Sequence, residues 1–168
     1  MFKATVICLS DKGYRGERDD KSSQVIINIL EKNNYKVVKN ILLPDDYYLL
    51  KHTLAEICDA GEADLILTTG GTGFSKRDIT PEATLEVIEK NVPGIPEAIR
   101  AHSMLITKRA MLSRAVAGIR SDTLIVNLPG SPKAVKESLE YIISTLHHGL
   151  KILTGKATEC ADDRNKNK

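Results

Sequence analysis

The amino-acid sequence predicts an α/β domain with a mostly parallel sheet and helices on both faces of that sheet. Short runs rich in Val, Ile and Leu alternate along the chain with longer segments in which apolar residues recur at helical spacing. The run at 63–69, ADLILTT, is apolar at consecutive positions, as expected of a strand that is covered on both faces. Strands separated by helices in this way favour a parallel sheet.

The first half of the chain supplies three of the expected strands. The segment 3–10, KATVICLS, is rich in β-branched residues and predicts a buried strand. Residues 11–20 are polar and contain two glycines, so a loop is expected there. A second strand is expected at 35–43, where the alternation of the first residues suits an edge or near-edge position, and the third is the run at 63–69.

Two helices are expected between these strands. Residues 21–34 carry four aliphatic side chains at helical spacing, and residues 47–60 carry three on one face. Asp45 or Asp46 is expected to cap the second of these helices, and Gly61 is expected to close it.

The second half of the chain is expected to hold further helices and a fourth strand. A helix is expected through Lys90, with Thr80 as its N-cap and Pro81 as its first residue. The remaining elements are a helix at 92–106, a stretch at 107–119 that is ambiguous between helix and loop, a strand at 122–128, and a turn followed by a long helix at 129–153. Ser131 is expected to cap that final helix, with Pro132 as its first residue.

Length and composition favour one domain at 1–153, followed by a polar, flexible tail at 154–168 that lacks periodicity. The chain has 168 residues, of which 42% are hydrophobic and 27% are charged, as in a soluble globular protein. Its net charge is only +2, with acids and bases interspersed, which argues against a protein defined by nucleic-acid binding.

The sequence predicts a cytoplasmic protein without a membrane anchor. No apolar stretch approaches the ~18 residues that a membrane helix needs, and the N-terminus runs straight into a strand-like pattern instead of a signal peptide. Cys8, Cys58 and Cys160 are far apart and form no CxxC pair and no Cys/His metal spacing. Cys8 and Cys58 lie in apolar patterns, so we expect both to be core thiols of a reducing compartment.

The loop after the third strand, 68–80 (TTGGTGFSKRDIT), combines three glycines with charged residues. Gly70, Gly71 and Gly73 allow the backbone to turn sharply and to approach a ligand closely, and successive N–H groups in such a turn can form an anion site. The helix that begins near Pro81 adds its positive end. The loop matches neither the P-loop nor the dinucleotide fingerprint. On the glycines alone, a phosphate site and a tight structural turn are both open interpretations.

Two aspartates at neighbouring strand ends point to a divalent cation. Asp78 lies in this loop and Asp45 follows the second strand, so both are expected at the carboxyl edge of the sheet, where α/β proteins bind ligands. A carboxylate beside phosphate repels it unless a cation bridges them, and Mg²⁺ is commonly bound by one or two carboxylates plus phosphate oxygens. The alternatives are helix capping for Asp45 and, for Asp78, a helix cap or a surface pair with Arg77.

Three further segments are candidates for a functional role. The turn at 127–135, NLPGSPKAV, opens a helix and predicts a second anion site at its N-terminus. Ser10 and Asp11 follow the first strand, with a functional role and no role equally open. Arg114 and Arg120, in SRAVAGIR, suit bidentate phosphate recognition, although most arginines are solvated surface residues.

Three motifs occur in this order: TTGGTGFSKRDITPEAT, AMLSRAVAGIR and TLIVNLPGSPKAV. Because of these motifs, the chain resembles the molybdenum-cofactor biosynthesis family over roughly residues 3–153. This family includes molybdopterin adenylyltransferases and the corresponding domains of gephyrin and its plant counterpart. The resemblance implies a three-layer α/β sandwich assembled as a homotrimer. It also implies binding of molybdopterin, the dithiolene pterin phosphate that carries molybdenum or tungsten, and a downstream metal-insertion protein as a further partner.

The resemblance implies transfer of AMP from ATP to the terminal phosphate of molybdopterin with release of pyrophosphate, assisted by Mg²⁺. Adenylyltransferases of the family carry RDxTPEA, which this chain has at 77–83, and a PDE-like turn. Here that turn is Pro44-Asp45-Asp46, whose third residue departs from the commoner Glu. A sister branch usually replaces the RD-T portion, so a molybdopterin-binding protein with weak or no adenylylation is the alternative. A structural or interaction domain is the alternative from a different class.

By resemblance, Asp45 and Asp78 are the catalytic pair that holds Mg²⁺. The residues expected to line the pocket for nucleotide and pterin are Ser10, Asp11, Gly70, Gly71, Thr72, Gly73, Ser113, Asn127, Pro129, Gly130 and Ser131.

Overall fold

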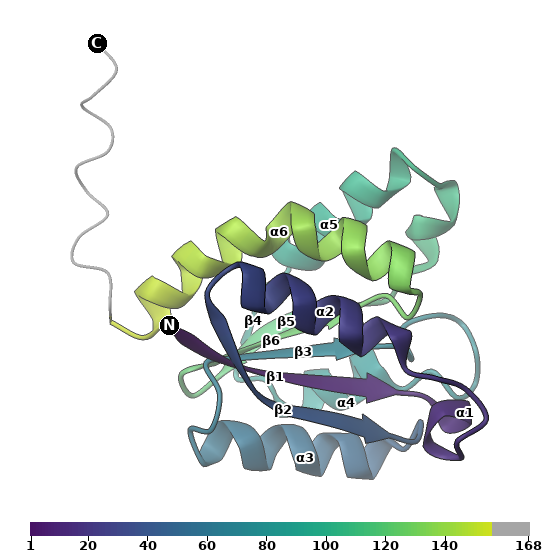
Figure 1. The fold of residues 1–168 in the computed structure, drawn as a ribbon, viewed down its shortest axis with the longest axis horizontal. Helices are drawn as coiled ribbons and strands as arrows, with labels where there is room; N and C mark the ends of the chain where they lie inside the picture. The colour runs from purple at the N-terminus through teal and green to yellow at the C-terminus, as the bar shows by residue number, and fades with distance from the viewer. Residues whose placement is uncertain (156–168) are drawn as a thin grey trace.

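Six strands form one sheet in the order β2-β1-β3-β6-β5-β4 in the computed structural model, which describes residues 1–155 (Figure 1). The strands are β1 (Phe2–Leu9), β2 (Tyr35–Leu43), β3 (Leu65–Thr69), β4 (Lys90–Asn91), β5 (Ala117–Arg120) and β6 (Thr123–Leu128). β1 pairs in parallel with β2 and β3, and β3 pairs in parallel with β6. β5 runs antiparallel to β6 and to β4. The prediction of a mostly parallel sheet, with the second strand at an edge, is confirmed.

Helices cover both faces of this sheet and produce the expected three layers (Figure 1). One face carries α2 (Lys21–Lys32), α5 (Gly94–Met104) and α6 (Pro132–Leu153). The other face carries α3 (Tyr47–Asp59) and α4 (Thr80–Val87). Within residues 1–155, no helix has the length and apolar character that crossing a membrane requires.

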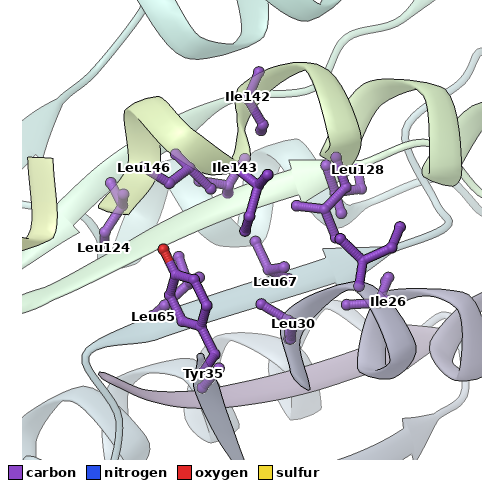
Figure 2. Close-up of a cluster of buried hydrophobic side chains, with 14 of the residues drawn as sticks. Ile26, Leu30, Tyr35, Leu65, Leu67, Leu124, Leu128, Ile142, Ile143 and Leu146 are labelled. Atoms are coloured by element: carbon purple, nitrogen blue, oxygen red, sulfur yellow. The ribbon is translucent and has the colours of Figure 1, made fainter. Parts of the chain in front are cut away.

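The pleat of the strands divides the apolar core between these two faces. Leu65 and Leu67 of β3 pack with Ile26 and Leu30 of α2 in a cluster that α6 completes (Figure 2). Ile66, between the two leucines, belongs to the opposite cluster, against α3 and α4. All five side chains are fully buried, and each such burial contributes about 1.5–3 kcal/mol. Burial on both faces explains why β3 is apolar at consecutive positions.

The chain between α4 and β6 departs from the prediction. The helix expected to reach Lys90 ends at Val87, and Lys90 instead begins β4. The ambiguous stretch at 107–119 contains the 3₁₀ helix η1 (Lys108–Leu112) and the start of β5. β4 and β5 have two and four residues, which is too short for an alternating pattern to be visible in the sequence. The predicted loop at 11–20 likewise contains one helical turn, α1 (Asp11–Tyr14).

Two helix caps have different outcomes. Ser131 caps α6 as predicted. The prediction for Thr80 is wrong, because Ile79 occupies the N-cap position of α4 and Thr80 is the first helical residue. The Thr80 hydroxyl instead donates to the main-chain oxygen of Gly70 at 2.9 Å, so it ties the start of the glycine-rich segment to the helix that follows.

Cys8 and Cys58 are buried and take part in no disulfide, which confirms the expectation of core thiols. Burial raises the pKa of Cys8 to about 12 and that of Cys58 to about 11, so neither thiol ionises near neutral pH. Cys160 lies outside the described residues, as does the predicted tail at 154–168 apart from its first two residues.

Candidate functional site

The loops singled out in the sequence leave the sheet at the same level. The last residues of β1 and β2, Leu9 and Leu43, are aligned with each other, and Thr69 at the end of β3 is aligned with Leu128 at the end of β6. Because these four strands are parallel, the segments after them all emerge at the carboxyl edge of the sheet. The structure therefore gathers the loops after β1, β2, β3 and β6 in one region.

The glycine loop, defined here as residues 70–79, begins with a turn that requires glycine. Gly70 has a φ of 94° and Gly71 a φ of 65°, a region that other residues rarely adopt. A Cβ atom on Gly70 would collide with the main-chain oxygen of Leu9, and one on Gly71 would collide with the hydroxyl of Thr80. Within residues 1–155 the main-chain N–H groups of Gly71 and Gly73 have no acceptor, so they are free to donate to an anion.

Asp11 and Asp45 are joined by a pair of reciprocal hydrogen bonds. The main-chain N–H of Asp11 donates to Oδ2 of Asp45, and the main-chain N–H of Asp45 donates to Oδ1 of Asp11, each at 3.0 Å. Arg77, from the glycine loop, donates two hydrogen bonds to the carboxylate of Asp11, from Nε and from Nη2, each at 2.9 Å. The loops after three different strands are thus connected through two carboxylates and one guanidinium.

These two carboxyl groups have opposite electrostatic surroundings. The hydrogen bonds from Arg77 lower the pKa of Asp11, with the main-chain N–H of Asp45 adding to the effect. Burial raises the pKa of Asp45, and the negative charges of Asp11 and Asp78 raise it further. Asp45 makes no ion pair within the described part of the chain, so its charge is poorly compensated.

Asp78 is part of the glycine loop, and Asp45 lies beside the same loop. Its Oδ2 accepts a hydrogen bond from the main-chain N–H of Ser75 at 3.0 Å. A Cβ atom on Gly73 would lie 2.9 Å from Oδ2 of Asp78, and one on Gly71 would lie 3.4 Å from Oδ1 of Asp45. Asp78 therefore lies beside Gly73, and Asp45 lies beside Gly71, two residues earlier in the loop.

The simpler alternatives for both aspartates do not match this geometry. Asp46, and not Asp45, caps α3 by accepting the N–H of Leu49 at 2.8 Å. Asp78 caps no helix, because α4 begins without a side-chain cap. Arg77 pairs with Asp11 instead of with its sequence neighbour Asp78.

The donor set fits a cation that is shared with phosphate. Residues 1–155 contain no group of three or more His, Cys, Asp or Glu side chains arranged to hold a metal by themselves. Asp45 and Asp78 each commit Oδ2 to a main-chain N–H, and Oδ1 of each accepts no hydrogen bond from the described residues. Mg²⁺ usually keeps several waters and takes only one or two carboxylates beside substrate phosphates, so two available oxygens suit it.

Two cavities adjoin the glycine loop, and together they are lined by eight of the eleven predicted pocket residues. A pocket of about 500 Å³ is lined by Ser10, Gly70, Gly130 and Ser131 of the predicted set. A second pocket of about 280 Å³ is lined by four others, Thr72, Gly73, Ser113 and Pro129, together with apolar side chains such as Ile99 and Leu112. Asp11, Asp45, Asp78, Gly71 and Asn127 line neither cavity.

The larger pocket also contains charged residues that sequence reasoning missed. Arg18, Asp19 and Asp20 line it from the segment before α2, and Lys21 lines it from the first position of that helix. Asp20 caps α2 by accepting the N–H of Ser23 at 2.9 Å. This segment was interpreted only as a polar loop. Its position between the first strand and the helix that follows, together with five consecutive charged residues at 17–21, is the signal that could have identified it.

Asn127 lies in the core, not on a cavity wall. Its side chain is fully buried, and its Oδ1 accepts the main-chain N–H of Val116 at 3.2 Å. Its Nδ2 donates to the hydroxyls of Thr68 at 2.9 Å and Thr84 at 3.0 Å. The amide of Asn127 therefore connects β3, α4 and the residue before β5, and makes no contact with solvent.

Both arginines considered for phosphate recognition are engaged by the protein. Arg120 binds the Asp59 carboxylate through Nε and Nη2 and the main-chain oxygen of Val87 through Nη1. Arg114 binds main-chain oxygens of the glycine loop and the carboxylate of Glu82. Neither guanidinium is free in this structure to bind phosphate.

Comparison with known proteins gives one consistent result. A family model described as a probable molybdopterin binding domain matches residues 5–148. The molybdopterin adenylyltransferase of Helicobacter pylori strain J99 is 37% identical over 157 residues, with 89% of this chain and 86% of that protein covered.

Solved structures agree in fold and in sequence. The molybdopterin biosynthesis enzyme MoaB of Thermus thermophilus is 45% identical, with a TM-score of 0.88 over 95% of this chain and 100% of that one. The tungsten cofactor synthesizing protein MoaB of Pyrococcus furiosus is 41% identical, with a TM-score of 0.82 over 90% of this chain and 96% of that one. The chain therefore belongs to the molybdopterin-binding family of molybdenum-cofactor biosynthesis proteins.

Proposed function

We propose that this protein is a molybdopterin adenylyltransferase, which transfers AMP from Mg-ATP to the terminal phosphate of molybdopterin. The observation that carries the proposal is that Asp78, within the glycine loop, and Asp45, beside Gly71 of that loop, lie together at the carboxyl edge of the sheet. The family membership and the name of the H. pylori relative support the same activity.

In the proposed reaction, an oxygen of the molybdopterin phosphate attacks the α-phosphorus of ATP. A new P–O bond forms, the bond between the α-phosphorus and the oxygen that bridges to the β-phosphorus breaks, and pyrophosphate leaves. A phosphate monoester is already largely ionised at pH 7, because its second pKa is about 6, so the attacking oxygen needs no general base. The main obstacles are alignment and the repulsion between two polyanions.

The residues of this chain can both align the two substrates and reduce the repulsion between them. Asp45 and Asp78 would hold Mg²⁺, which when bound neutralises phosphate charge as a Lewis acid. N–H groups of the glycine loop and the N-terminus of α6 at Ser131 bind phosphate oxygens. The two cavities beside the loop accommodate the two substrates. Asp11 fixes the orientation of Asp45, and Asn127 fixes the strands beneath the loop.

The proposal is tested with purified protein, molybdopterin, ATP and MgCl₂. We expect pyrophosphate and adenylyl-molybdopterin to form in equal amounts, and we expect chelation of the divalent cation to stop the reaction. Saturable binding of molybdopterin without any release of pyrophosphate would contradict the proposal.

That contrary result would favour a second candidate, a molybdopterin-binding protein without efficient adenylylation. The solved structure that is 45% identical to this chain is named a molybdopterin biosynthesis enzyme, and that name does not specify adenylylation. The sequence RDITPEA at 77–83 argues for the enzyme, because Asp78 of this motif is one of the two acids at the site.

We extend the proposal to assembly, partner and compartment. A homotrimer is expected from the family resemblance, and light scattering should then give three times the 18.5 kDa of one chain. A metal-insertion protein would use the adenylylated product. Two buried, unpaired cysteines suit the reducing cytoplasm.

A further inference from the structure

Arg114 is bound to both ends of the exposed part of the glycine loop. Its Nε donates to the main-chain oxygen of Gly73 at 2.7 Å, and its Nη2 donates to the main-chain oxygen of Asp78 at 2.9 Å. Its Nη1 pairs with the carboxylate of Glu82 in the first turn of α4, and its main-chain N–H donates to the oxygen of Thr72 at 2.9 Å. We propose that Arg114 is a positioning residue that fixes the glycine loop and thereby presents the Asp78 carboxylate to the substrates.

The loop has few other fixed points between Gly73 and Asp78. Phe74, Ser75, Lys76 and Arg77 are exposed, and the hydrogen bonds between Ser75 and Asp78 lie within the loop itself. The other polar contact from residues 74–77 to the rest of the described chain is the ion pair between Arg77 and Asp11, whose arginine side chain is 62% exposed. The side chain of Arg114 is only 32% exposed, so its bonds are better shielded from water.

The chemistry of the guanidinium group suits this role. Its planar fork donates in several directions at once and stays charged at all physiological pH values, and bonds from a charged donor are roughly twice as strong as neutral ones. All three nitrogens of Arg114 have a protein acceptor. A lysine at this position keeps the charge but has a single nitrogen, so it lacks the planar fork that contacts Gly73 and Asp78 from two separate atoms.

The structural part of this proposal is tested by hydrogen exchange, which needs no substrate. We expect Arg114→Lys to speed exchange within 73–79 by about tenfold or more at the hydrogen-bonded amides of Ser75, Arg77 and Asp78, since losing a hydrogen bond to a charged group has at least that effect. Glu82→Gln, which keeps Arg114 and removes the negative charge of one of its partners, should give a smaller increase in the same amides.

Arg120→Lys is the matched control. Arg120 also makes three hydrogen bonds and is similarly exposed, at 26%, but it lies at the other end of β5 and binds Asp59. It should leave exchange at 73–79 unchanged. Equal exchange at 73–79 in the Arg114 and Arg120 variants would overturn the proposal, whatever reaction the protein catalyses.

The catalytic part rests on the proposed adenylylation and is tested by a double-mutant cycle with Asp78. We expect Arg114→Lys to lower turnover by about 10- to 100-fold, since small displacements of reacting groups have effects of this size. In an Asp78→Asn background the same substitution should change turnover by less than about twofold, because the group it positions is gone. Fully multiplicative effects would overturn the proposal. If the unmodified protein forms no pyrophosphate, the proposed function fails while the exchange experiment still decides the role of Arg114.

Discussion

Asp11 and Asp45 each donate a main-chain N–H to the carboxylate of the other, at 3.0 Å in both directions. This exchange joins the loop after β1 to the loop after β2, and Arg77 adds the loop after β3. The guanidinium lies on Asp11, so the charge of Asp11 is compensated by an ion pair, whereas Asp45 makes no ion pair within residues 1–155. The acid without a protein cation is the one suited to take a metal ion.

Asp45→Asn should stabilise the protein at pH 7 and abolish adenylylation. Burial places the folded-state pKa of Asp45 above its usual 3.8, so the ionised side chain is disfavoured by the fold. The free energy of unfolding therefore falls as the pH rises from 3.8 through the raised folded-state pKa of Asp45, and it stays lower at all higher pH values. The asparagine oxygen can still accept the N–H of Asp11. We expect a rise of a few degrees in Tm at pH 7.

The same measurement at about pH 3 provides the internal control, because Asp45 is then protonated in both states and the gain should disappear. Asp46→Asn is the matched variant, since asparagine caps a helix about as well as aspartate. It should leave both Tm and turnover close to the original values. A lower Tm for Asp45→Asn at pH 7 would contradict the argument from burial.

Asp78→Asn should leave the fold intact and cost about 10²–10³-fold in turnover, the usual effect of removing one electrostatic partner of the transition state. The asparagine can keep the hydrogen bond from Ser75. Turnover and Tm are measured together, with Asp122→Asn, an exposed acid beside a different cavity, as the control. Turnover within about threefold of the original would exclude Asp78 as a ligand of the metal.

Much of this arrangement follows from the sequence because parallel strands share one carboxyl edge. Once β1, β2, β3 and β6 are recognised from their apolar runs, the positions of Asp45, Asp78 and Ser131 at that edge follow from topology alone. Glycines and acids in those loops then mark the candidate site.

What could not be predicted depends on which neighbour a side chain meets. Thr80 is a residue type that commonly caps helices, yet its hydroxyl donates to the main-chain oxygen of Gly70 instead. Asn127 ends an apolar strand beside a turn and resembles a pocket residue, but the pleat directs it into the core with Ile125. β4 pairs with β5, which itself pairs with β6, and these pairings are tertiary contacts that no local pattern records.

Arg77→Gln should make the protein less stable at neutral pH and also less sensitive to acid. Arg77 lowers the folded-state pKa of Asp11 below 3.8, so this ion pair contributes in full above pH 3.8 and is lost as pH falls through the lowered value. The pair is partly exposed, with Arg77 62% accessible, so the effect on Tm should be small.

Urea unfolding at pH 7 and at about pH 2.5 measures this difference, which should shrink at the lower pH. Arg15→Gln is the control, because Arg15 pairs with Glu17 two residues away and joins no separate loops. An equal loss of stability for Arg77→Gln at both pH values would show that its pairing with Asp11 is not the cause.

Asn127→Ala should destabilise the protein by about 3 kcal/mol, because it leaves the N–H of Val116 and two threonine hydroxyls without their partner in the core. Asn28→Ala, at an exposed position of α2, should stay within about 0.5 kcal/mol. Denaturant unfolding checks both values. If Asn127 instead contacted substrate, its removal would raise KM at nearly unchanged stability. The structural role instead predicts a loss of stability together with a lower kcat, because the loops above the strands would be displaced.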